Sequence, residues 1–228
     1  MGSWLKLVAA DGHELSAYVG RPEGTPRGSL VVIQEIFGVN AHIQSIVDGF
    51  AKEGYVAIAP ALFDRIQPGV ALKYEGEDLQ VAFELYRKLN PETAILDVAT
   101  AFKQVESEGA GCGIVGYCYG GLMSWLSATR GPLHGFEPKA CVGYYAGGIG
   151  SVAQEQPFCP VMLHFGANDD HIGTDQIEAV RIAHTDVDIF VYEGAGHGFN
   201  CDVRGSYDPQ ASALARQRTL AFFQKNIG

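Results

Sequence analysis

The sequence predicts an α/β fold with a mostly parallel central sheet that is covered by helices on both faces. Short apolar segments alternate with segments of helical periodicity along most of the chain, which is typical of repeated strand–helix units. The strand segments are apolar throughout, as expected where both faces of a strand are buried. The length of 228 residues fits one domain of this class. We therefore expect a single α/β domain over residues 1–228.

The expected strands begin with an N-terminal hairpin. Residues 15–19 follow the turn signal Asp11-Gly12 and can close that hairpin. Residues 29–33 (SLVVI) form a continuous apolar run, and residues 55–59 (YVAIA) are stopped by Pro60. Further strands are expected at 112–115, 140–144, 161–165 and 187–191.

The expected helices are indicated by apolar spacing and by capping residues. Apolar positions recur at helical spacing in residues 41–53, and Gly54 follows as a typical C-terminal cap. Asn90 precedes Pro91, which suits the first position of a helix, and the pair predicts a helix to about residue 108. Other helices are expected at 79–89, 122–129, 175–183 and 209–224, whereas residues 61–77 are expected to be irregular.

Charge and hydropathy argue against several classes of protein. The net charge of −10 disfavours a nucleic-acid binder, which needs a basic face to neutralise phosphate. No apolar stretch approaches the length of about 20 residues that a membrane span needs, and the first twelve residues do not resemble a signal peptide. We therefore expect a cytoplasmic protein that binds neither nucleic acid nor membrane.

The cysteines give little support to a disulfide framework or a zinc site. Their number is odd, no C-x-x-C pair occurs, and the histidines and cysteines lack zinc-ligand spacing. We therefore expect free thiols, no metal and no cofactor. The five cysteines are Cys112, Cys118, Cys141, Cys159 and Cys201.

One cysteine lies in a motif that carries chemistry. Residues 112–121 read CGIVGYCYGG, an apolar strand followed by a glycine-flanked turn and then a helix. This is the G-x-S-x-G nucleophile elbow with cysteine in place of serine, and it predicts an α/β-hydrolase fold. Glycine is needed at Gly116 and Gly120 because side chains there would collide with neighbouring backbone. The N-terminus of the following helix favours a thiolate, so Cys118 is the expected nucleophile.

A thiol nucleophile needs a base, and the base needs an acid that orients it. In α/β-hydrolases the chain order is nucleophile, acid, base. After residues 161–165 the sequence reads GANDDH, so Asp169 and Asp170 both follow a strand end and both qualify as the acid. After the next strand, His197 lies between two glycines and is the expected base.

The attacked carbonyl develops negative charge, which two backbone N–H donors must stabilise. One donor is expected from Tyr119, directly after the nucleophile. The other is expected from the loop at residues 34–38, where we favour the N–H of Ile36.

Five short motifs follow one another along the chain. They are QEIFG at 34–38, P-x-L-F at 60–63, GYCYGG at 116–121, HFGANDDHI at 164–172 and AGHGFN at 195–200. Together they resemble the dienelactone hydrolase (carboxymethylenebutenolidase) family, from about Val8 to near Phe223. The resemblance implies an α/β-hydrolase fold and the hydrolysis of an ester or lactone.

The resemblance also implies roles for individual residues. The family's nucleophile is a cysteine, which corresponds to Cys118, and the acid of its G-x-x-D turn corresponds to Asp169. Its glutamate in Q-E-x-x-G corresponds to Glu35, which is implied to interact with the resting thiol and to help form the thiolate when substrate enters. Substrate contacts are expected from Phe37, Phe83, Tyr86, Phe199 and Arg204.

Two positions depart from the family. Its type members hold the substrate carboxylate with two arginines, where this chain has Leu79 and Cys201. Arg204 lies three residues after Cys201 and is one candidate to meet an anionic substrate. Arg65 and Arg87 are the other candidates.

These residues together predict acyl transfer through a thioester on Cys118, with a small ester or lactone as the substrate. Two alternatives stay open. One is a broad-specificity short-chain carboxylesterase or thioesterase that does not act on dienelactone. The other is a non-catalytic protein in which Cys118 is a redox-responsive thiol. The chain is expected to be a monomer or a small homo-oligomer.

Overall fold

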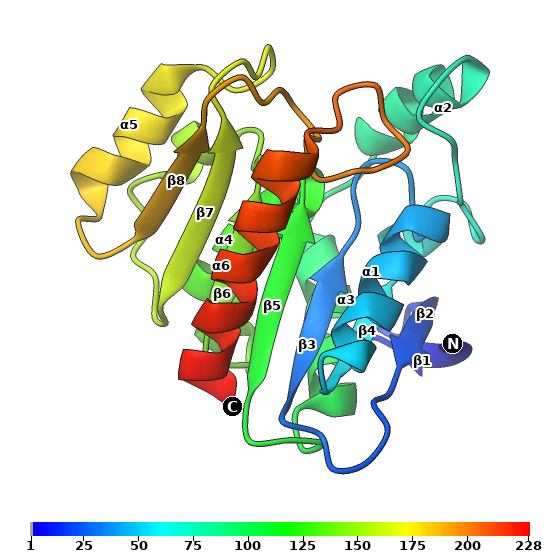
Figure 1. Ribbon diagram of the computed structural model, residues 1–228. Helices are drawn as coiled ribbons and strands as arrows, with labels where there is room; N and C mark the ends of the chain where they lie inside the picture. Colours follow the sequence, from blue (N-terminus) through cyan, green and yellow to red (C-terminus); the bar gives the residue numbers. More distant parts are fainter. Residues whose placement is uncertain (1) are drawn as a thin grey trace.

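One eight-stranded sheet organises the chain. The computed structural model describes residues 2–228, and Met1 lies outside the described residues. The strand order is β1-β2-β4-β3-β5-β6-β7-β8 (Figure 1). The β1–β2 hairpin and the β2–β4 pair are antiparallel and the other pairs are parallel, so the predicted mostly parallel sheet is confirmed. The strands are β1 (Ser3–Val8), β2 (Glu14–Gly20), β3 (Gly28–Ile33), β4 (Tyr55–Pro60), β5 (Cys112–Tyr117), β6 (Cys141–Tyr144), β7 (Val161–Gly166) and β8 (Asp188–Tyr192).

Helices cover both faces of the sheet. In Figure 1, α1 and α6 lie in front of the strands, α3 and α4 lie behind them, and α2 lies beyond their upper ends. Among residues 2–228 no helix combines the length and the apolar character that crossing a bilayer requires. The α-helices are α1 (Ala41–Lys52), α2 (Glu77–Tyr86), α3 (Pro91–Val105), α4 (Tyr119–Arg130), α5 (Thr174–Ala183) and α6 (Pro209–Ile227). Three short 3-10 helices are η1 (Leu62–Arg65), η2 (Gly131–His134) and η3 (Ile149–Val152).

Capping side chains explain where several helices begin. Asn40 Oδ1 accepts the N–H of Ile43 at 3.2 Å at the start of α1, and Asn90 Oδ1 accepts the N–H of Glu92 at 3.0 Å at the start of α3. The helix predicted over residues 79–89 begins and ends earlier, at Glu77–Tyr86. The chain must leave that helix before Asn90, because Asn90 is extended and caps the next one.

The central strands form the buried core. Every residue of β3, β4, β5 and β7 is buried, as their unbroken apolar sequences predict for a sheet covered on both faces. β8 lies at the edge and is half-exposed along most of its length.

The parallel strands bring their carboxyl ends to one edge of the sheet. Glu35 follows β3, Cys118 follows β5, Asp169 follows β7 and His197 follows β8. Chemistry in open parallel sheets lies beyond this edge. The topology alone therefore brings the predicted nucleophile, acid and base into one region, at the upper end of the strands in Figure 1.

A buried ion pair ties η1 to α3. Arg65 donates two hydrogen bonds of 2.7 Å to the carboxylate of Asp97, whose side chain is completely buried, and a further one of 2.7 Å to Asp11. The guanidinium is thus fully engaged in the fold. The prediction of Arg65 as a contact for an anionic substrate is therefore not supported by the structure.

We expect Arg65→Ala to lower the free energy of unfolding by about 3–5 kcal/mol, because the substitution leaves the buried Asp97 carboxylate without its partner. Arg21 supplies a matched control, since its 2.8 Å pair with Glu108 is exposed. Arg21→Ala should cost about 1 kcal/mol or less. Chemical denaturation followed by circular dichroism measures both values, and an equal loss in the two variants would contradict the structural role of Arg65.

Candidate active site

Cys118 occupies a strained turn between β5 and α4. Its backbone has φ 55° and ψ −115°, a conformation that residues other than glycine rarely adopt. A Cβ on Gly116 would lie 1.8 Å from the carbonyl oxygen of Gly120, and a Cβ on Gly120 would lie 2.3 Å from that of Ile33. Only glycine fits at both positions. The elbow predicted from GYCYG is therefore present, and it presents Sγ at the carboxyl edge of the sheet.

A chain of short contacts joins the thiol to a buried carboxylate. His197 Nε2 lies 3.3 Å from Cys118 Sγ, and His197 Nδ1 donates to Asp169 Oδ2 at 2.8 Å. Asp169 Oδ1 accepts the backbone N–H groups of His171 and Ile172 at 2.8 and 3.2 Å. These bonds fix the carboxylate in the turn after β7, where its side chain is completely buried.

The two aspartates that the sequence leaves open are distinguished by this geometry. Asp169 contacts His197, whereas Asp170 is exposed. A carboxylate can orient the imidazole only from within hydrogen-bond distance. The arrangement therefore favours Asp169 as the acid.

The electrostatics of the site favour a charged imidazole. Burial lowers the pKa of His197, but its hydrogen bonds with Asp169 and Cys118 outweigh burial and raise the pKa to about 10. Burial raises the pKa of Asp169, yet the hydrogen bond from His197 more than compensates, and the pKa lies below its ordinary value. Both shifts favour the imidazolium–carboxylate form of this pair.

The loop after β3 is held by Gln34. Its side-chain Nε2 donates to the carbonyl oxygen of Glu35 at 3.2 Å, and its Oε1 accepts the N–H of Leu62 at 3.1 Å. The peptide bond is planar and trans, so the N–H of Ile36 points opposite to the Glu35 carbonyl. Ile36 and Tyr119, the two predicted oxyanion donors, both line the cavity that contains Cys118.

Glu35 is not hydrogen-bonded to the thiol in this structure. Its side chain is completely buried, and neither carboxylate oxygen has a hydrogen-bond partner among residues 2–228. The nearby cation is Arg204, whose Nη1 lies 3.6 Å from Glu35 Oε1. The implied contact between Glu35 and the resting thiol is absent because Sγ faces His197.

A cavity of about 400 Å³ opens over Cys118. Its wall is mostly aromatic and aliphatic, with polar groups near the thiol. Of the predicted substrate contacts, Phe37, Phe83, Tyr86 and Arg204 line it. The remaining lining residues are Ile36, Tyr74, Leu79, Cys118, Tyr119, Gly147, Gly148, His171 and His197.

Phe199, a predicted substrate contact, does not line the cavity in this structure. Phe199 is completely buried, and its ring packs 5.5 Å from that of Tyr145 and 5.2 Å from that of Tyr192, measured between centroids. Arg87 is exposed at the end of α2 and does not line the cavity.

The side chains of two cavity residues, Tyr74 and His171, were not predicted from the sequence to lie in the site. His171 packs edge-on against His197, with 4.9 Å between ring centroids, and its place beside the acid turn was the signal for it. Tyr74 lies in the irregular stretch 61–77, where no periodicity indicates which side chains face inward. Its ring packs 4.4 Å from that of Phe37, and Arg204 lies over both rings, 5.5 Å from Tyr74 and 5.9 Å from Phe37.

Comparison with known proteins points to one family. The family model described as the dienelactone hydrolase family matches residues 15–227. A carboxymethylenebutenolidase from Pseudomonas putida is 32% identical over 228 residues, which cover 96% of this chain and 94% of that protein.

Solved structures agree with this result. A Klebsiella pneumoniae protein proposed to be a dienelactone hydrolase superposes with a TM-score of 0.82 at 30% identity, and the match covers 98% of both chains. An esterase from Pyrococcus furiosus superposes with a TM-score of 0.71 over 100% of this chain and 91% of its own. At 13% identity the second match supports the fold alone.

We expect iodoacetamide at neutral pH to modify Cys118 first, because its Sγ lines the cavity beside a charged imidazole. Asp169→Asn should slow this labelling about tenfold or more, since an amide no longer raises the pKa of His197 and the imidazole becomes neutral. Asp170→Asn is the matched control and should label at the wild-type rate. Mass spectrometry of the Cys118 peptide gives the rates. Slow labelling in Asp170→Asn together with normal labelling in Asp169→Asn would make Asp170 the acid.

Proposed function

The chain belongs to the dienelactone hydrolase family and is a carboxylic ester hydrolase, and we propose that it cleaves its ester or lactone through a thioester on Cys118. One observation carries the proposal: the contacts of 3.3 Å and 2.8 Å that link Cys118 Sγ, His197 and Asp169 in a single chain. A nucleophile beside a base, with the base oriented by an acid, is the arrangement that acyl transfer requires.

In the first half of the reaction the Cys118 thiolate, whose proton resides on His197 Nε2, attacks the carbonyl carbon. The electron pair of the carbonyl moves to its oxygen, which the N–H groups of Ile36 and Tyr119 stabilise. When the intermediate collapses, the C–O bond of the ester or lactone breaks. The leaving oxygen takes the proton from Nε2, and the acyl group remains on Sγ as a thioester.

In the second half a water molecule gives a proton to His197 Nε2 and attacks the thioester carbonyl. The carbon–sulfur bond then breaks, the carboxylic acid leaves, and the thiolate is restored beside the protonated His197. Asp169 stays ionised throughout and stabilises the imidazolium. An ester whose leaving group departs easily suits this chemistry best.

Arg204 is the proposed contact for a negative charge on the substrate. It lines the same cavity as His197, and its guanidinium lies over the rings of Phe37 and Tyr74. Leu79 lines the same cavity, where the type members have an arginine. A single arginine in an otherwise apolar wall favours a monoanionic ester with an apolar or aromatic body. We propose that the Glu35 carboxylate, whose Oε1 lies 3.6 Å from Arg204 Nη1, pairs with Arg204 when no substrate is bound. The substrate anion then takes the place of Glu35 beside Arg204 or binds next to it.

A broad-specificity short-chain carboxylesterase or thioesterase is the second candidate. The loss of two family arginines, at Leu79 and Cys201, favours it. Turnover of dienelactone compared with that of simple short-chain esters distinguishes the two functions.

We propose the cytoplasm as the location, because the five cysteines are free and a reducing compartment keeps thiols free.

We expect Cys118→Ala to lower the hydrolysis of p-nitrophenyl acetate by about 10³-fold or more, because the nucleophile is removed. Cys159→Ala removes another half-buried thiol, one that lies outside the cavity, and should keep wild-type activity. A quenched reaction of the wild type should show the added mass of one acyl group on the Cys118 peptide. Full activity in Cys118→Ala would overturn the mechanism.

We expect Arg204→Gln to change the preference between charged and neutral substrates. The ratio of kcat/KM for a p-nitrophenyl hemi-ester of a dicarboxylic acid to that for a neutral ester of equal length should fall about tenfold or more, since a charged hydrogen-bond pair is lost. The ratio cancels any general loss that follows from leaving Glu35 unpaired. Arg87→Gln is the control and should leave the ratio unchanged. A constant ratio in Arg204→Gln would show that Arg204 does not bind the substrate.

A further inference from the structure

A second group of possible ligands lies outside the Cys118 cavity. His42, Cys201 and Asp202 each offer one donor atom, and an imidazole nitrogen, the thiol sulfur and a carboxylate oxygen lie within 4.8 Å of one another. His42 belongs to the first turn of α1, whereas the other two belong to the loop between His197 and α6. Up to 160 residues of sequence separate these donors, so no local spacing indicates them.

We propose that His42, Cys201 and Asp202 form a binding site for a thiophilic divalent cation, with Zn²⁺ as the preferred ion. Imidazole, thiolate and carboxylate are the three side-chain ligand types of zinc in proteins. Three protein ligands leave a fourth position for water. The soft sulfur ligand disfavours Mg²⁺ and Ca²⁺, which prefer oxygen.

The distances fit a tetrahedral ion after a small adjustment. His42 Nδ1 and Asp202 Oδ1 are 3.1 Å apart. Two ligands about 2.0–2.1 Å from a tetrahedral zinc lie roughly 3.3 Å from each other, and a sulfur lies roughly 3.6 Å from a nitrogen or oxygen ligand. The other two donor–donor distances involve Cys201 Sγ and are at most 4.8 Å, so Sγ must move closer to His42 and Asp202 when the ion binds.

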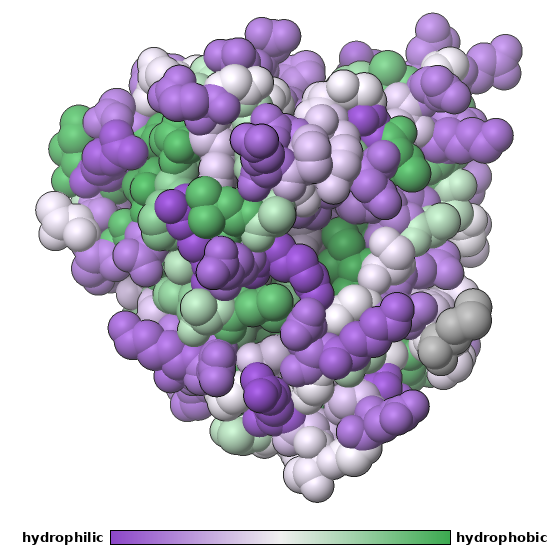
Figure 2. Space-filling model, viewed as in Figure 1, coloured by the Kyte–Doolittle hydropathy of each residue, from purple (hydrophilic) through white to green (hydrophobic). Residues whose placement is uncertain are grey.

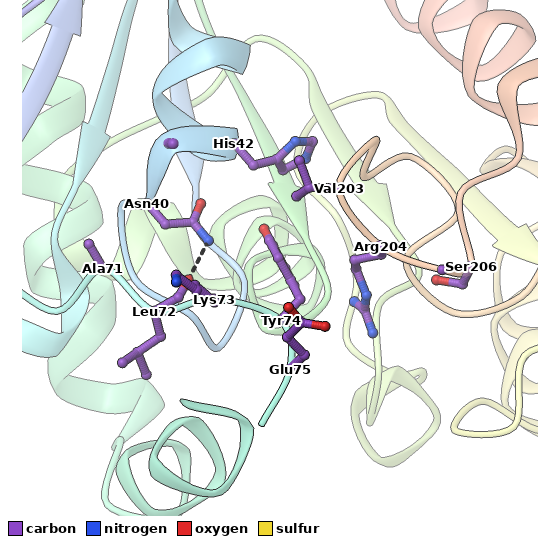
Figure 3. A pocket seen from close by; sticks show the side chains of 12 residues that line it. Asn40, His42, Ala71, Leu72, Lys73, Tyr74, Glu75, Val203, Arg204 and Ser206 are labelled. Carbon is purple, nitrogen blue, oxygen red and sulfur yellow. Dashed lines mark hydrogen bonds between the residues drawn. The ribbon is translucent and has the colours of Figure 1, made fainter. Parts of the chain in front are cut away.

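Burial holds the His42 ring at the site. His42 is only 7% exposed, and its Nδ1 faces the exposed carboxylate of Asp202 at 3.1 Å. Figure 3 shows the His42 ring reaching from α1 to Val203, the residue after Asp202, so the imidazole is turned toward the loop that supplies the other two donors.

An ion could reach this site without passing the catalytic thiol. His42 lines a cavity of about 610 Å³ together with Tyr74 and Arg204 (Figure 3). His42 and Asp202 also line a smaller cavity of about 230 Å³ between α1 and α6. Figure 2, drawn from that side, shows hydrophobic residues at the bottom of a hollow with a hydrophilic border. Cys118 lines neither cavity.

Binding would exchange a proton for the metal. The ion would form a bond to the Cys201 sulfur and displace the thiol proton, with one proton released for each ion bound. The thiolate and the Asp202 carboxylate would then neutralise the two charges of the cation. The bound ion would tie the loop that carries Arg204 to α1.

The test uses the full-length chain with Cys118→Ala, so that the catalytic thiol and His197 cannot hold the metal. Co²⁺ titration should give a near-ultraviolet thiolate-to-cobalt charge-transfer band that saturates at one ion per chain. Competition between the protein and a chromogenic chelator then gives the Zn²⁺ affinity, and release of one proton per ion is measured in weak buffer. These readouts do not depend on hydrolysis.

In this background Cys201→Ser should abolish the charge-transfer band, and Asp202→Asn should weaken Zn²⁺ binding by about tenfold or more. Cys159→Ser and Asp186→Asn replace a thiol and an exposed carboxylate away from the cluster and should bind as the parent does. Asp202 is exposed, so its variant decides the question even if the buried Cys201→Ser does not fold. No Zn²⁺ binding by the parent, or binding that Asp202→Asn and Cys201→Ser leave unchanged, would overturn the site.

Discussion

The positive φ of Cys118 is the constraint on which the active site depends. A non-glycine residue in this conformation costs about 1–3 kcal/mol, and the surrounding structure must hold it there. β5 and α4 fix the chain on either side, and the N–H of Cys118 donates to the carbonyl oxygen of Tyr144 in β6 at 3.0 Å. The strain is thus offset by regular structure. In this conformation the Cys118 side chain projects away from its own backbone at the edge of the sheet, where His197 can contact the thiol.

Charge balance is the second constraint on the site. Asp169 and Glu35 are both completely buried carboxylates, and each would be costly without a cation nearby. His197 compensates Asp169 through a direct hydrogen bond, whereas Arg204 compensates Glu35 only loosely, at 3.6 Å. The first pair is therefore rigid and orients the base. The second leaves both the guanidinium and the carboxylate with unused hydrogen-bonding capacity, which is the condition under which a substrate anion can enter.

Most of the fold and the positions of the proposed nucleophile, acid and base could be predicted because their signals are local. Each of these signals lies within a few consecutive residues. They are the unbroken apolar strands, the helix start at Asn90-Pro91 and the glycine pattern around Cys118. The acid and the base could also be placed, since each directly follows a strand and parallel strands bring such positions to one edge. Phe199 was predicted to contact substrate because it lies close to His197 in the sequence. Closeness in sequence does not show which side of a loop faces the cavity, and Phe199 is buried outside it.

The local sequence was thus sufficient for the elbow at Cys118 and for the strand that each proposed catalytic residue follows, because these features depend on steric rules over short distances. The tertiary structure decided what depends on contacts between distant segments. It favours Asp169 over Asp170 as the acid, because one carboxylate lies 2.8 Å from His197 and the other is exposed to solvent. It assigned Arg65 to a buried ion pair and Arg204 to the cavity, although as residues in a sequence they look alike. It also brought His42 to Cys201 and Asp202, because the packing of α1 beside the last loop joins residues that no spacing relates.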